Sequence, residues 1–105
     1  MHVEQIGWGV ARQVVRVLRD HGVHDPAGIL DRLPDVAEVA GFLAYAVFEG
    51  RTATAAALVE LPGPDGDTAA YLGDALTPDA DPGTHEALVA RARHDVANSG
   101  VELLI

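Results

Sequence analysis

The sequence predicts an α+β fold in which helices pack on a mixed, mainly antiparallel sheet, within one domain covering residues 1–105. Three observations predict this class. Residues 8–22 place apolar side chains at helical spacing, and residues 42–76 change to apolar runs joined by turn formers. Residues 85–99 return to helical spacing before a short final apolar run. The expected order is therefore helix, helix, strand, strand, strand, helix, strand.

Composition narrows the classes of function. The chain of 105 residues has a net charge of −9, with seven arginines and no lysine, so we expect it to repel nucleic acids and anionic membranes. It has no cysteine, which excludes disulfides and sulfur-based zinc sites. The first residues lack the pattern of a signal peptide, and no apolar run approaches the ~20 residues that cross a bilayer. We therefore expect a cytoplasmic protein.

The segment WGVARQVVRVLRDHG, residues 8–22, predicts an amphipathic helix. Its expected apolar face consists of Val10, Val14, Val17, Leu18 and His21. Its opposite face carries Arg12, Arg16 and Arg19. These arginines could receive an acidic partner or a phosphate, but in so acidic a chain we expect them to pair with its own carboxylates.

Two shorter segments flank this helix. Residues 2–6 are a candidate short strand. Asp25 followed by Pro26 is typical of a helix cap and a first-turn proline, so we expect a second helix through AGILDRL. Pro34 should interrupt that helix.

Three strands are expected between residues 42 and 77. FLAYAVF and TATAAALVEL form a hairpin in which Gly50 adopts the positive φ that a tight turn needs. The turn-forming residues PGPDGD follow as a loop. They lead into the strand TAAYLGDALT, which Pro78 ends because proline cannot donate to a ladder.

The last helix is expected in HEALVARARHDVANS, with Leu88, Val89, Ala92 and Val96 on its apolar face. Gly100 is placed to close this helix in the left-handed conformation. The final strand, VELLI, requires a crossover back to the sheet. Because one edge of this strand can remain unpaired, we expect a homodimer or a protein partner at the edge formed by Val101, Leu103 and Ile105.

The hairpin VFEGRTATAAALVEL, the strand AYLGDALTP and the run GTHEALVARARHDVANSGVELLI together resemble the middle of the GNAT acetyltransferase superfamily. The resemblance covers residues 41–105, and the two leading helices fit the same order. It implies that the loop after the third strand and the start of the next helix bind the pyrophosphate of acetyl-CoA through backbone N–H groups. The positions implied for this cofactor are Gly83, Thr84 and His85.

The loop departs from the family pattern of arginine or glutamine, two residues, glycine, one residue, then glycine or alanine. With Gly83 as the first glycine, Ala80 takes the arginine or glutamine position and His85 the second small one. Asp79 and Asp81 bring negative charge to the place of the pyrophosphate, at a cost on the order of 1 kcal/mol or more each. Read without a ligand, TPDADPGTHEAL is an ordinary helix start, with Asp81 as N-cap and Pro82 in the first turn.

Asp74 is the candidate catalytic carboxylate, because strand alternation places it on the same side as Leu72 and Leu76, where burial would suit it to act as a general base. The alternative, which we favour, is that Asp74 lies at an exposed edge or that its neighbours, rather than Asp74 itself, face the core. Tyr45 and Tyr71 lie on strands, so neither matches the tyrosine acid of the family.

A metal site is not expected anywhere in the chain. The cluster HGVHD offers His21, His24 and Asp25, but histidines at a helix end more often serve as favourable charges there.

Three functions are therefore left open. The first is a degenerate or partial GNAT-like domain that binds a partner or completes an assembly, with no cofactor. The second is a small N-acetyltransferase that uses acyl-CoA. The third is an acidic decoy that inhibits a basic partner, which the net charge of −9 alone suggests.

Overall fold

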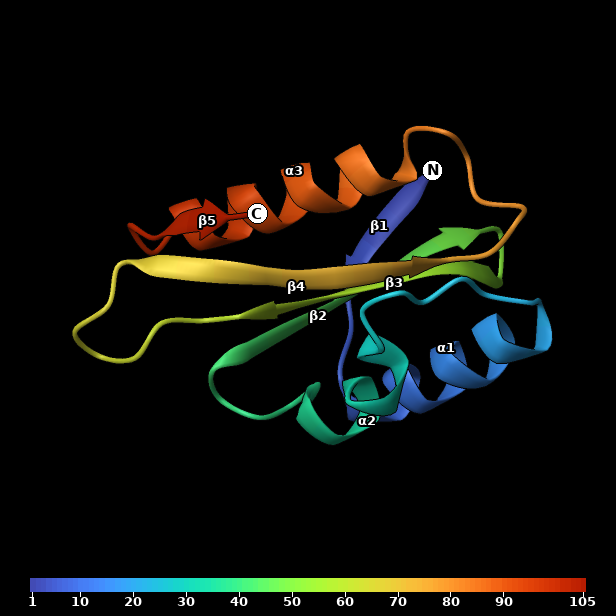
Figure 1. The fold of residues 1–105 in the computed structure, drawn as a ribbon, viewed down its shortest axis with the longest axis horizontal. Helices are drawn as coiled ribbons and strands as arrows, with labels where there is room; N and C mark the ends of the chain where they lie inside the picture. Colours follow the sequence, from blue (N-terminus) through green and yellow to red (C-terminus); the bar gives the residue numbers. More distant parts are fainter.

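A computed structural model describes all 105 residues and shows a five-stranded sheet between two helical layers (Figure 1). The elements, in order, are β1 (His2–Gln5), α1 (Trp8–Asp20), the 3-10 turn η1 (Ile29–Asp31), α2 (Leu33–Val36), β2 (Phe42–Glu49), β3 (Thr52–Glu60), β4 (Thr68–Leu76), α3 (Thr84–Ala97) and β5 (Glu102–Leu104). The predicted α+β class is confirmed, and the candidate strand at residues 2–6 is β1. None of the helices combines the length and apolar character that crossing a bilayer requires.

The strands follow chain order across the sheet, from β1 to β5. The first four are antiparallel neighbours, whereas β5 returns parallel to β4 after the crossover through α3. Gly50 in the β2–β3 turn has φ of 63°, as predicted, because a tight hairpin needs a residue without a Cβ there. β5 pairs only with Thr68–Ala70, the first residues of β4, so the rest of that edge of β4 is left without a partner strand.

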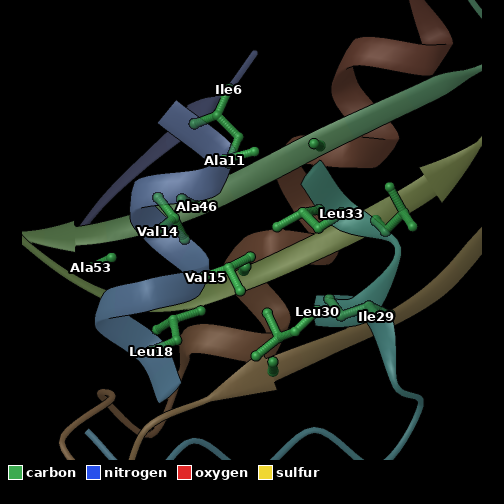
Figure 2. Close-up of a cluster of buried hydrophobic side chains, with 14 residues drawn as sticks. Ile6, Ala11, Val14, Val15, Leu18, Ile29, Leu30, Leu33, Ala46 and Ala53 are labelled. Carbon is green, nitrogen blue, oxygen red and sulfur yellow. The ribbon is translucent and has the colours of Figure 1, made fainter. Parts of the chain in front are cut away.

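The face of the sheet under α1 carries the larger core, a cluster of 14 buried residues that α1, η1 and α2 close (Figure 2). The buried stripe of α1 is Ala11, Val14, Val15 and Leu18. This differs from the predicted face, because Val10 is 43% exposed, His21 is exposed too, and Val17 is only partly buried. The buried stripe is as wide as the predicted one but lies further round the helix, toward Ala11 and Val15.

The predicted second helix is shorter than expected and split in two. The carboxylate of Asp25 accepts the backbone N–H groups of Ile29 at 2.9 Å and Leu30 at 3.0 Å, as a capping residue does, although the N-cap position itself is Gly28. The element it caps is η1, a single turn of 3-10 helix. The helical pattern does break next to Pro34, as predicted, but the proline lies in the first turn of a new short helix, α2, which begins at Leu33.

A β-bulge interrupts β4 opposite β3. Leu58 pairs with Gly73 and Val59 with Tyr71, so Leu72 is the extra residue. Gly73 has φ of 145°, and a Cβ on it would lie 2.6 Å from the Cβ of Ala27. The bulge therefore changes which side chains share a face of β4, and it occurs where the α1–η1 connection lies against the strand.

α3 covers the other face and buries the predicted residues, which are Leu88, Val89, Ala92 and Val96. Gly100, with φ of 73°, ends it as predicted, and the N–H of Val101 returns to the carbonyl of Val96 at 3.1 Å.

The beginning of α3 differs from the prediction. The N-cap is Gly83, and Asp81 and Pro82 precede the helix. The carbonyl of Asp81 accepts the N–H of Thr84 at 3.1 Å, which closes a β-turn with Pro82 at its second position.

Candidate functional site

Three side chains meet where β4 ends and α3 begins. The carboxylate of Asp74 accepts the hydroxyl of Tyr71 at 2.7 Å and the Nδ1–H of His85 at 2.5 Å, both on Oδ2. The rings of Tyr71 and His85 meet edge to face, with centroids 5.9 Å apart. Tyr71 and Asp74 reach the same side because the bulge at Leu72 shifts the alternation of β4.

This arrangement corrects the predicted position of Asp74. Leu72 packs against the core under α1, whereas Tyr71 and Leu76 pack against the core under α3. Asp74 therefore shares a face with Tyr71 and Leu76, and not with Leu72. Its side chain is only 14% exposed, so the favoured expectation of an exposed edge carboxylate was wrong as well.

Two polar atoms of the Tyr71, Asp74 and His85 group have no hydrogen-bond partner in the chain, namely Nε2 of His85 and Oδ1 of Asp74. The side chain of His85 is 49% exposed, and its Nδ1–H is committed to Asp74. The carboxylate thereby fixes one tautomer, in which Nε2 is the proton acceptor. A neutral His85 ring therefore presents Nε2 as a hydrogen-bond acceptor at a fixed position.

The hydroxyl of Tyr71 does not lose its proton at ordinary pH, so it cannot act as an acid. Burial, the hydrogen bond to Asp74 and the charge of that carboxylate all raise the pKa of its hydroxyl far above the usual value of 10.0. The hydroxyl of Tyr71 therefore serves to hold Asp74 in place.

The loop between β4 and α3 is acidic and engages its own groups. From Asp74 to Glu86 the chain carries four carboxylates and no arginine or lysine. The hydroxyl of Thr84 is buried and donates to the carbonyl of Asp81 at 2.7 Å. Gly83 is exposed, and its carbonyl accepts the N–H of Ala87 at 3.0 Å. Of the three predicted cofactor positions, two have side chains that are hydrogen-bonded within the chain. The ring of His85 bonds to Asp74, and the hydroxyl of Thr84 bonds to the carbonyl of Asp81.

The unpaired edge of β4 is also partly covered. His24, in the connection after α1, forms an isolated antiparallel bridge with Leu76. Its N–H donates to the carbonyl of Leu76 at 2.9 Å, and its carbonyl accepts the N–H of Leu76 at 3.1 Å. This segment closes the end of β4 that lies nearest to α3's first turn.

Solved structures share this arrangement of strands and helices. A protein assigned to the GNAT acetyltransferase family from Desulfovibrio desulfuricans is 19% identical, with a TM-score of 0.69 over 95% of this chain and 68% of its own. The PaiA N-acetyltransferase from Thermoplasma acidophilum, solved with coenzyme A, is 14% identical, with a TM-score of 0.69 over 96% of this chain and 76% of its own. The chain has a GNAT-like fold.

An aminoglycoside acetyltransferase from an uncultured soil sample, solved with sisomicin, shares the GNAT fold at 10% identity, with a TM-score of 0.71 over 99% of this chain and 74% of its own. No protein-family model matches the sequence, and no curated protein matches it. At such low identity the likeness concerns the fold, and it transfers no activity.

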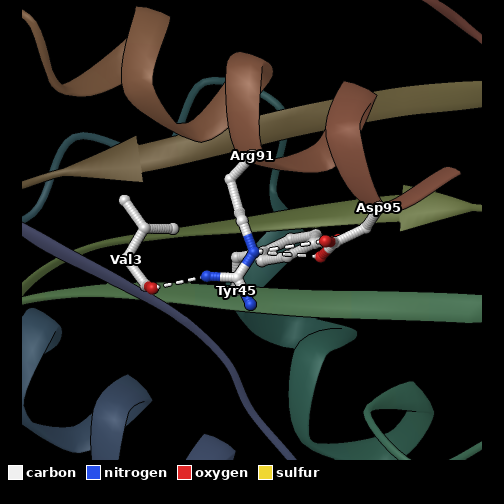
Figure 3. A network of polar contacts seen from close by, with 4 residues as sticks. All are labelled: Val3, Tyr45, Arg91 and Asp95. Carbon is white, nitrogen blue, oxygen red and sulfur yellow. Dashed lines mark hydrogen bonds and ion pairs between the residues drawn. The ribbon is translucent and has the colours of Figure 1, made fainter. Parts of the chain in front are cut away.

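A second polar network, which the sequence did not predict, lies on the α3 face of the GNAT fold (Figure 3). Asp95 Oδ2 accepts the hydroxyl of Tyr45 at 2.8 Å and Nε of Arg91 at 3.1 Å. Arg91 also donates through Nη1 to the carbonyl of Val3 at 2.7 Å. Arg91 and Asp95 are four residues apart on α3, and this spacing predicts their ion pair. The sequence around Tyr45 contains no pattern that predicts its hydrogen bond to Asp95.

The arginines of α1 only partly follow the prediction. Arg19 pairs with Asp31 at 2.7 Å. Arg12 instead stacks on Trp8, with its guanidinium carbon 5.0 Å from the ring centroid, and Arg16 forms no ion pair. The expectation that all three pair with the chain's own carboxylates was therefore wrong for Arg12 and Arg16, because no carboxylate lies within ion-pair distance of them.

The HGVHD segment assembles no metal site. His21 uses Nδ1 to contact the carbonyl of Val17 at 2.8 Å, at the end of α1. No three metal-binding side chains converge anywhere in the structure.

Proposed function

We propose that this chain is a GNAT-fold binding or assembly module that does not catalyse acetyl transfer. The observation that carries the proposal is the charge around the start of α3. The stretch from residue 74 to residue 86, which leads into that helix, contains Asp74, Asp79, Asp81 and Glu86 and no arginine or lysine. A helix N-terminus attracts an anion through its N–H groups and dipole, but carboxylates within a few ångströms oppose a diphosphate by a similar or larger energy.

Two contacts support the same proposal. His85 occupies the second small position of the family's loop, and its ring is held by Asp74 at 2.5 Å across the first turn of α3. The bridge between His24 and Leu76 occupies backbone groups at the edge of β4. An extended ligand with amide groups would have to displace that bridge in order to pair there.

We further propose that the module associates through the outer edge of β5. This strand is the last of the sheet, so one of its edges has no neighbour in the chain. Leu104 and Ile105 are 65% and 66% exposed beside it. The side chains of Val101 and Leu103 face the core under α3, so contacts at this edge involve their backbone and the side chains of Leu104 and Ile105. A second copy of the chain is the simplest partner.

One observation favours the alternative, a small acyl-CoA-dependent N-acetyltransferase. Tyr71, Asp74 and His85 hold a reachable proton acceptor at the end of β4, and enzymes with this fold include one solved with coenzyme A. In such an enzyme His85 Nε2 would accept the proton of the attacking amine. Asp74, which is nearly enclosed, would hold that ring in place.

Calorimetry with acetyl-CoA separates the two functions. The binding module predicts no saturable heat at ligand concentrations up to about 1 mM, because the loop cannot compensate the charge of the diphosphate. Dissociation constants near 1 μM would support the enzyme instead. Replacing Asp79 and Asp81 by asparagine together is the matched variant, since a gain of binding in it would identify these carboxylates as the cause.

A further inference from the structure

A cavity of about 340 Å³ lies at the far end of α3 from the candidate site. It opens between the last turn of α3, the start of β5, the ends of β1 and β2, and the loop that joins β3 to β4. Its volume falls at the lower end of the range for small-molecule sites, about 300–1,000 Å³. With 14 residues in α3, the two ends of that helix are separated by about 20 Å.

The wall of the cavity is largely apolar, with a few polar groups. Leu43, Leu61, Val96 and Val101 supply apolar surface. Gly66 shapes the rim, because a Cβ on it would lie 2.7 Å from the Cβ of Pro62. Such a lining suits a compact ligand with an apolar body.

Asp95 is the one charged residue in the wall of the cavity, and it is paired with Arg91. Oδ2 of Asp95 receives Tyr45 and Arg91, whereas Oδ1 has only one long contact, 3.3 Å from Nε of Arg91. A carboxylate oxygen can accept two hydrogen bonds, so Oδ1 retains capacity. Asp95 lines this cavity, but Arg91 lines the neighbouring groove along β1, so the carboxylate lies on the cavity side of the ion pair.

Two further electrostatic features favour the binding of a cation in this cavity. The last turn of α3 ends at the cavity, with Val96 and Ser99 in its wall, and a helix C-terminus carries partial negative charge. The chain as a whole has a net charge of −9, which attracts cations and repels anions.

We propose that this cavity binds a small organic cation, namely a primary ammonium on an apolar body of six to eight carbons. The ammonium donates to Oδ1 of Asp95, near the carbonyl end of α3, and the body contacts Leu43, Leu61 and Val101. The inference does not depend on whether the start of α3 binds acyl-CoA, because the two places are separated by the length of α3.

The test uses three probes of nearly equal shape and different charge: cyclohexylmethylamine, cyclohexylmethanol and cyclohexanecarboxylate. Backbone amide shifts are followed by NMR in the whole chain. The amine is expected to shift the amides of Val96, Ser99 and Val101 saturably in the millimolar range or below, and the alcohol about tenfold more weakly. The carboxylate is expected to produce no saturable shift. Equal binding of amine and carboxylate, or no saturable shift with the amine at about 20 mM, would overturn the proposal.

Variants locate the site. Asp95→Asn should lower the affinity for the amine about tenfold and leave the alcohol unchanged, and circular dichroism confirms that the variant is folded. Ser99→Trp keeps the Asp95 network and fills the cavity, so it should abolish binding of every probe. Glu102→Gln removes the same charge outside the cavity wall and should change the affinity less than about twofold. Unaltered amine binding in Asp95→Asn or in Ser99→Trp would contradict the assignment.

Discussion

Asp74 holds two partners with one nearly enclosed carboxylate, so its removal should be costly. Asp74→Ala leaves the hydroxyl of Tyr71 without an acceptor, and such a loss costs about 1–3 kcal/mol of the free energy of unfolding. Urea denaturation measures it. Asp79→Ala is the control, because this exposed carboxylate has no such partner and should change stability by less than about 0.5 kcal/mol. Equal effects of the two substitutions would contradict the described role of Asp74.

Both tyrosines of the chain should resist ionisation in the folded state. Burial is the largest cause, and the neighbouring carboxylates Asp95 and Asp74 add to it, so the pKa values of Tyr45 and Tyr71 lie well above the unfolded value of 10.0. A raised pKa means that the stabilisation is complete below pH 10.0 and is lost as the pH rises above that value, because the unfolded chain ionises first.

Ultraviolet absorbance of phenolate checks this directly. The folded chain should show little phenolate at one unit above the ordinary pKa of 10.0, and unfolding at that pH should release the signal of both residues. Half-ionisation of either tyrosine near pH 10 in the folded chain would refute the burial described here.

The β-bulge at Leu72 limited how well the surroundings of Asp74 could be predicted from the sequence. Asp74 was identified as the interesting carboxylate, but regular alternation along β4 placed it beside Leu72, which faces the other core, and missed Tyr71. The extra residue, Leu72, follows from how β4 matches β3 and from the close contact of Gly73 with Ala27, and neither is a property of the local sequence. The hydrogen bond between Tyr71 and Asp74 therefore could not be predicted from the sequence alone.

At the level of elements, Gly73, the only glycine within a strand, should be hard to replace. Gly73→Ala combines a positive φ of 145° with a Cβ only 2.6 Å from that of Ala27, so it should lower stability by at least about 1–3 kcal/mol. Gly9→Ala is the matched control, because Gly9 lies within α1 and a Cβ there meets nothing within 4 Å. It should raise stability by up to about 1 kcal/mol. Thermal unfolding of both variants should show a lower melting temperature for Gly73→Ala and an equal or higher one for Gly9→Ala. A melting temperature unchanged by Gly73→Ala would contradict the bulge geometry.

Elements with strong periodic signals were predicted well. The hairpin of β2 and β3, the strand β4 and the body of α3 follow from apolar runs and from glycines that need positive φ, such as Gly50 and Gly100. The division of residues 29–36 into η1 and α2 was not predicted, because Asp25 and Pro34 are equally compatible with one long helix and with two short turns. Packing of Ile29 and Leu33 against the sheet decides between them.

At the scale of the whole molecule, the outer edge of β5 should make association depend on concentration. Sedimentation velocity is expected to show a monomer converting to a dimer as concentration rises. Leu104→Lys should shift this equilibrium toward monomer at least tenfold, because a charge at an exposed strand edge opposes pairing. Val10→Lys, at another exposed apolar position, should leave it unchanged. A monomer at every accessible concentration would refute association through this edge.

The overall charge and the fold could both be predicted from the sequence, whereas the state of the loop before α3 needed the structure. The distribution of Asp79 and Asp81 suggested a spoiled anion site, and the contact of His85 with Asp74 adds a reason that no sequence pattern contains.

The most direct measurement follows the backbone amides of His85 and Glu86 by NMR while acetyl-CoA is added. Both signals are expected to stay in place up to about 1 mM ligand, because the carboxylates of Asp79, Asp81 and Glu86, in and just before this helix start, oppose the charge of a diphosphate. Large, saturating shifts of these two amides at micromolar ligand would show that the start of α3 binds acyl-CoA, and the account of a non-catalytic module would be wrong.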